Sequence, residues 1–176
     1  MHNGDIGYLQ QHKSYITGLI EHIDTCVEAD GSEHLSDKRF LDWPSTPNEP
    51  GVEAGYRALL RWALQDGEKL CRMLNDDTHA DLCLSIIQRL DKQVKAPNGL
   101  KQAAALMAIA ELMPADKACR EVISVGGAER FSTFYGYYML QALAQAGEYR
   151  QALDIIRQYW GGMLRLGATT FWRTST

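Results

Sequence analysis

The sequence lacks any long apolar run, and this absence excludes one class of protein. No stretch approaches the roughly 18 apolar residues that a membrane-spanning helix needs. The first residues, MHNGDIGYLQQHKS, contain no positively charged start followed by an apolar run, so they are not typical of a signal peptide. We therefore expect a soluble chain without a membrane partner, while an export signal on a longer parent chain and the localisation of the protein stay open.

The sequence also lacks clusters of basic residues, and its cysteines and histidines are not spaced as metal ligands usually are. The 18 Lys and Arg residues are scattered among 22 acidic residues, with a formal net charge of −4. No basic stripe could neutralise a run of phosphates, so we expect no nucleic-acid partner. The four cysteines form no C-x-x-C pair and have no nearby histidine pair, which predicts core cysteines and neither a metal nor a cofactor. They are Cys26, Cys71, Cys83 and Cys119.

What the sequence contains is the composition of a helical globular protein. Apolar residues make up 45% and charged residues 23% of 176 positions, which suits one domain with a buried core. Apolar residues recur at three- and four-residue steps, whereas no window of four to eight residues alternates with β-branched enrichment. We predict an all-α fold of antiparallel helical hairpins that forms a single helical domain over 1–176.

The periodicity and the breakers between periodic segments predict seven helices. The segment 100–113 is apolar nearly all round and is expected to be buried on most faces. Gly161 and Gly162 are expected to end the last helix. The segment 31–51 contains three of the five prolines and predicts a long loop, a feature that is more often functional than incidental. We place the helices at 8–27, 52–74, 78–94, 100–113, 114–125, 132–146 and 149–160.

Helical hairpins of this kind assemble in two ways. They stack as an open solenoid, or they curl into a closed toroid of inner and outer helices. The segment LAQAGEYRQALDI at 143–155 is similar to the turn of a tetratricopeptide-type hairpin, but no repeat of about 34 residues occurs elsewhere. A non-catalytic helical-repeat binding module is therefore the alternative interpretation.

Three segments carry side chains suited to a binding site. In the long loop, Asp42 beside Trp43 offers a charged acceptor next to a flat apolar face, as a sugar ring requires. A turn capped by Asp42 and anchored by a buried Trp43 explains the same pattern equally well. The aromatic helix start at 131–138 could line a pocket, although core packing is the commoner role. The glycine-rich segment 161–172 lacks the features of a phosphate-binding loop, and the five histidines form no catalytic constellation.

Taken together, the three segments resemble a known enzyme family. The phrases RFLDWPS at 39–45, FSTFYGYYML at 131–140 and YWGGMLRLGATTFW at 159–172 are similar to the C-terminal portion of the catalytic domain of bacterial α-L-rhamnosidases, glycoside hydrolase family 78. The resemblance implies part of an (α/α)6 toroid, the six-hairpin glycosidase fold. It also implies inverting hydrolysis of terminal α-L-rhamnosyl linkages by two carboxylates, with a rhamnose-containing carbohydrate as partner.

The resemblance further implies the roles of individual residues. The family's general base directly follows the last Trp of these phrases, and that position here is Arg173, which stays protonated and cannot accept a proton from water. The general acid has no counterpart between 1 and 30, so it is expected outside the chain. We therefore predict a fragment that is inactive alone and that self-associates through an uncovered apolar helix flank. The implied substrate-binding residues are Asp42, Trp43, Tyr135, Phe171 and Trp172.

Overall fold

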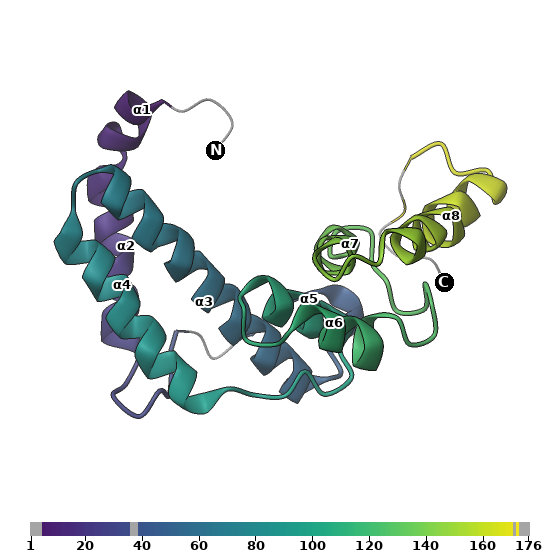
Figure 1. Ribbon diagram of the computed structural model, residues 1–176, viewed down its shortest axis with the longest axis horizontal. Helices are drawn as coiled ribbons and strands as arrows, with labels where there is room; N and C mark the ends of the chain where they lie inside the picture. Colours follow the sequence, from purple (N-terminus) through teal and green to yellow (C-terminus); the bar gives the residue numbers. More distant parts are fainter. Residues whose placement is uncertain (1–4, 36–38, 171, 173–176) are drawn as a thin grey trace. The chain divides into compact units, whose positions relative to one another are not determined.

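The computed structural model describes residues 5–35, 39–170 and 172, and its regular structure is helical (Figure 1). This confirms the all-α prediction, because the described part of the chain contains no strand and only an isolated antiparallel bridge between Val27 and Glu33. None of the described helices has the length and apolarity needed to cross a membrane. The α-helices are α1 (Ile6–Gln11), α2 (Lys13–Cys26), α3 (Glu49–Met73), α4 (Asp77–Leu90), α5 (Lys101–Ile109), α6 (Ala115–Ala118), α7 (Gly136–Gln145) and α8 (Tyr149–Arg165). Short 3-10 helices η1 (Trp43–Ser45) and η2 (Asp91–Gln93) and a π-helical turn η3 (Cys119–Ile123) complete the set.

The described residues form two compact units. The first unit takes its residues from 1–38 and 60–94, and the second from 39–59 and 95–176. Helix α3 contributes its first half to the second unit and its second half to the first. The proposed single domain over 1–176 stays a prediction.

In the first unit, three helices pack around one apolar core: α2, α4 and the second half of α3. Helices α2 and α4 lie against each other, and the second half of α3 adds Leu64 and Cys71 to the same core. Each fully buried Leu or Ile contributes about 1.5–3 kcal/mol through its removal from water. A Cβ at Gly67 of α3 would lie 3.4 Å from the Cys83 sulfur, so α3 and α4 approach closely. Cys71 and Cys83 are buried and free, as is Cys119 in the second unit, whereas Cys26 is only partly buried.

The second unit is organised around α5. All nine residues of α5 are buried, which agrees with the expectation for this segment, and α5 packs against α7 and α6. At Gly55 in the first half of α3, a Cβ would lie 3.2 Å from the Ala103 Cα of α5. Helices α7 and α8 contact each other, and the turn that joins them contains Gly147 in the left-handed region, with φ of 77°.

The predicted helix end at Gly161 and Gly162 is wrong, because α8 continues through both glycines to Arg165. Ile155, Tyr159 and Met163 of α8 recur at helical spacing and are all buried, so packing holds the helix together across residues of low helix propensity. The helix ends instead at Arg165, and the chain turns at Gly167, which follows the C-cap and has φ of 84°.

Candidate functional site

A pocket of about 630 Å³ in the second unit brings the three segments together. We call it the aromatic pocket. Its volume lies within the usual range of about 300–1,000 Å³ for small-molecule sites. The lining residues come from the loop before α3, from the start of α7 and from the segment after α8: Phe40, Leu41, Asp42, Trp43, Thr133, Phe134, Tyr135, Tyr137, Tyr138 and Trp172.

Asp42 places a buried carboxylate in this pocket. The residue is 5% exposed, its Oδ1 accepts a hydrogen bond from the Trp43 N–H at 2.9 Å, and its Oδ2 accepts one from Gln102 Nε2 at 3.2 Å. Its backbone N–H also donates to Ser45 Oγ at 3.1 Å, which completes a capping box on η1. Asp42 therefore does cap a turn, as the alternative interpretation expected. Each carboxylate oxygen still has a further lone pair that can accept a ligand hydroxyl.

Trp43 does not anchor the loop, and the expectation of a buried indole in the alternative interpretation is wrong. Its side chain is exposed at the pocket, with a relative accessibility of 58%. The ring contacts Phe40 edge to face, with centroids 4.9 Å apart. The local cap fixes the backbone beside Trp43, so the structure presents a flat apolar surface next to the Asp42 carboxylate.

Tyr135 also lines the aromatic pocket. It is buried, and its ring lies 5.3 Å from that of Tyr138 and 5.6 Å from that of Phe134, between centroids. Burial, with smaller contributions from Tyr138 and the Asp42 charge, raises the pKa of Tyr135 to about 12. The phenol therefore stays protonated at neutral pH.

The structure thus places four of the predicted site residues around one pocket: Asp42, Trp43, Tyr135 and Trp172. The Thr133 hydroxyl donates to the backbone carbonyl of Trp172, which ties the last described residue to the start of α7. Phe171 and Arg173 lie outside the described residues. The roles of all these residues in binding sugar stay predictions.

Sequence reasoning missed Gln102, which does not line the aromatic pocket but is hydrogen-bonded to Asp42. Gln102 is 1% exposed, donates to Asp42 from Nε2, and leaves its Oε1 without a hydrogen-bond partner. An unsatisfied buried acceptor costs about 1–3 kcal/mol. The available sequence indication was a polar amide at the start of a run that is otherwise apolar nearly all round.

Lys101 is a second buried polar residue on α5. Its Nζ donates to the Gly127 carbonyl oxygen at 2.8 Å and lies 5.1 Å from the centroid of the Phe131 ring. Burial lowers the pKa of Lys101 to about 8. Lys101 thereby connects α5 to the segment that leads into α7.

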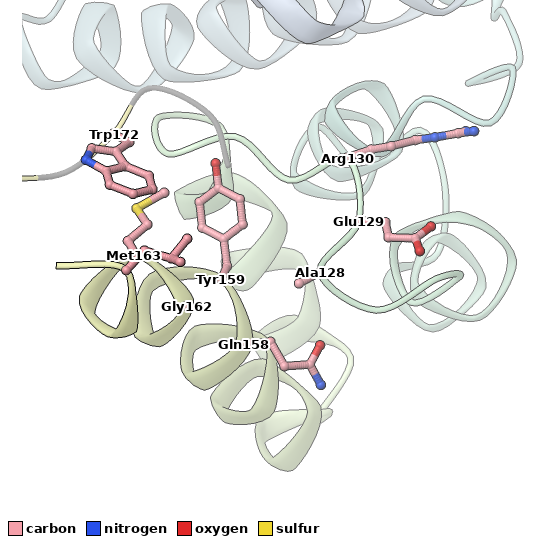
Figure 2. A pocket seen from close by; sticks show the side chains of 9 residues that line it. Ala128, Glu129, Arg130, Gln158, Tyr159, Gly162, Met163 and Trp172 are labelled. Atoms are coloured by element: carbon pink, nitrogen blue, oxygen red, sulfur yellow. The ribbon is translucent and has the colours of Figure 1, made fainter. Parts of the chain in front are cut away.

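A second pocket, of about 410 Å³, shares Trp172 with the aromatic pocket (Figure 2). Trp172, Met163 and Tyr159 gather on one side of it, while Ala128 lies across from them on the segment before α7. The side chains of Glu129 and Arg130 extend away from Tyr159 in this view.

The charged groups at the aromatic pocket are few. Asp42 is the only carboxylate among the residues that line it, within the described part of the chain. No group of three or more His, Cys, Asp or Glu side chains that could hold a metal ion occurs within residues 5–35, 39–170 and 172. The pocket therefore combines one buried anionic acceptor with aromatic surfaces.

Comparisons with known proteins do not extend this description. No protein-family model, curated protein or solved structure matches the chain.

Proposed function

We propose that the aromatic pocket binds the terminal sugar of a rhamnose-containing carbohydrate. The observation that carries this proposal is the buried carboxylate of Asp42 in a pocket that two tryptophans, Trp43 and Trp172, also line. A sugar ring presents C–H groups on its faces, which suit an indole surface, and hydroxyls at its edge, which a carboxylate accepts.

The apolar share of the lining favours a 6-deoxy sugar. Leu41, Phe134 and Tyr138 add carbon atoms to the lining that Asp42 shares. A methyl group in place of a hydroxymethyl group avoids burying a further hydroxyl without a partner. L-rhamnose has such a methyl group, together with vicinal hydroxyls for Asp42.

The larger setting of this proposal is an α-L-rhamnosidase-like glycoside hydrolase, of which the helical hairpins represent part of an (α/α)6 toroid. Inverting hydrolysis needs one carboxylic acid to protonate the leaving oxygen and a second carboxylate to activate water. Asp42 supplies one carboxylate to the described pocket, and a guanidinium stands at the family's general-base position in Arg173. Binding without turnover is therefore the expected behaviour of this chain.

Calorimetric titration with methyl α-L-rhamnoside tests the proposal. Asp42→Asn keeps an acceptor for the cap and lets Gln102 rotate its amide to pair with the new side chain, but it removes the charge. We expect the affinity to fall about tenfold or more, since a hydrogen bond to a charged group contributes about 1.5–3 kcal/mol. Asp116→Asn, on the exposed part of α6, is the matched control and is expected to bind as the unmodified chain does.

The binding proposal is contradicted if methyl α-L-rhamnoside does not bind, or if Asp42→Asn leaves its affinity unchanged. The expectation of binding without turnover is contradicted if the chain releases the aryl group from an aryl α-L-rhamnoside at a rate well above that of the Asp42→Asn variant.

A second candidate function follows from the exposed face of α8. Tyr149, Leu153 and Ile156 recur on one stripe of this helix and are all exposed. Such a stripe suits a helical-repeat module that binds protein, or self-association. Sedimentation velocity distinguishes the two: a dimer that Leu153→Asp converts to a monomer supports self-association, and a monomer throughout argues against it.

A further inference from the structure

We infer that the second pocket is a subsite for the next sugar unit, so that the ligand of this chain is an oligosaccharide rather than a single sugar. This inference rests on the proposed function of the aromatic pocket. It concerns the cavity next to Trp172, to which neither the sequence phrases nor the proposed function assigns a ligand.

The first support is the position of Trp172. The residue lines both cavities, so the two are neighbours that share one residue. The Thr133 hydroxyl, itself at the aromatic pocket, holds the Trp172 backbone. Trp172 is therefore the point at which a ligand in the aromatic pocket is nearest to the second pocket.

The second support is the chemistry of the lining. Tyr159, Met163 and Trp172 form an apolar side, and the exposed amide of Gln158 lies at the rim (Figure 2). Like the aromatic pocket, the second pocket has an aromatic surface with a polar group beside it. The polar group here is an amide, whereas in the aromatic pocket it is the buried carboxylate. Amides suit sugar hydroxyls because they both donate and accept hydrogen bonds.

The third support is Gly162, which lines the second pocket from inside α8. A glycine within a helix destabilises it by roughly 0.5–1 kcal/mol relative to alanine. A Cβ at Gly162 would meet only the Arg165 guanidinium, at 3.8 Å, so packing against other elements does not require glycine there. The missing side chain keeps the second pocket open.

The test compares methyl α-L-rhamnoside with a set of rhamnose disaccharides of different linkage, by calorimetry on the full chain. We expect at least one disaccharide to bind about tenfold more tightly than the monosaccharide. Gly162→Leu places a branched side chain in the second pocket, where it competes with a sugar ring, and should bring the ratio of the two affinities to about one. Gly161→Leu is the matched control, because Gly161 precedes it in α8 but does not line the pocket, and it should preserve the ratio.

Gln158→Ala provides a second variant on an exposed position, with Gln145→Ala, at the exposed end of α7, as its control. We expect Gln158→Ala alone to reduce the disaccharide advantage several-fold. Monosaccharide binding with no disaccharide advantage, or an advantage that Gly162→Leu and Gln158→Ala leave intact, overturns the inference while the proposed function stands. Absence of binding for every sugar overturns both.

Discussion

At the scale of single residues, the polar groups of α5 explain how the site is supported. Gln102 and Lys101 follow each other in the sequence and are both buried, yet they serve different segments. Gln102 donates to the Asp42 carboxylate, whereas Lys101 donates to the Gly127 carbonyl. Burial of polar groups is costly unless each has a partner, so these two contacts tie both segments to α5.

Burial of Lys101 makes the free energy of unfolding depend on pH, and its environment fixes the sign of this dependence. Its pKa is lowered from 10.5 to about 8, so the unfolded chain keeps this proton at pH values where the folded chain has lost it. Stability from this group therefore rises with pH between about 8 and 10.5, by an amount on the order of 1–3 kcal/mol.

The comparison with Lys101→Met isolates this contribution. Burial raises the pKa of the Cys83 and Cys119 thiols to about 11, which opposes the trend above about pH 9 but is common to both proteins. In urea unfolding, the stability difference between the unmodified chain and the variant should shift in favour of the unmodified chain from about pH 7 to about pH 10. A difference that does not change with pH would refute the assignment.

At the scale of elements, α8 shows what local sequence preference leaves undetermined. Two adjacent glycines predict a helix end, but the buried stripe of Ile155, Tyr159 and Met163 extends the helix past them. The stripe is visible in the sequence, whereas the surface that buries it is not. Replacing a glycine of this unit by alanine does not always have the same effect on stability, and we expect opposite effects at two of them.

Gly161→Ala should stabilise the protein by about 0.5–1 kcal/mol. The new Cβ would make an ordinary contact of 3.5 Å with Arg165. Gly136→Ala in α7 should destabilise by about 1–3 kcal/mol, because its Cβ would lie 2.8 Å from the Trp160 ring. Thermal unfolding of both variants checks the pair. Equal effects of the same sign would contradict the packing of α7 against α8.

In the first unit, His79 connects α4 to α2. Its Nδ1 lies 2.8 Å from Asp76 Oδ1 and its Nε2 lies 3.1 Å from Glu21 Oε1, while Lys13 approaches the other oxygen of Asp76 at 2.9 Å. Hydrogen bonds to Asp76 and Glu21 raise the pKa of His79 above its usual value of 6.5. The pKa of Asp76 is held well below its usual range by Lys13 and His79, so Asp76 stays charged through this range.

The stabilisation by charged His79 is present below pH 6.5 and is lost as the pH rises through the raised pKa. His79→Gln should therefore lower stability in mild acid and have a smaller effect in mild base, measured by urea unfolding. His22→Gln, on the exposed face of α2, is the control. The opposite order, with the larger loss in base, would rule out this contact as the cause.

At the scale of the whole molecule, the sequence predicted the helical class and the buried α5 from periodicity alone. The sequence also predicted Asp42, Trp43, Tyr135 and Trp172 as site residues, and these line one pocket although they come from distant segments. It could not predict the Gln102 contact with Asp42 or the second pocket. Both depend on how α5 and α8 are placed against other segments, which no local pattern encodes.

Our central proposal is that a sugar binds at Asp42, between Trp43 and Trp172. The chain has four tryptophans, so its indole N–H signals can be followed one by one in an NMR titration. With methyl α-L-rhamnoside, the account predicts shifts for Trp43 and Trp172, while Trp62 of α3 and Trp160 of α8 stay unchanged. Unchanged signals for Trp43 and Trp172 at saturating sugar would contradict it.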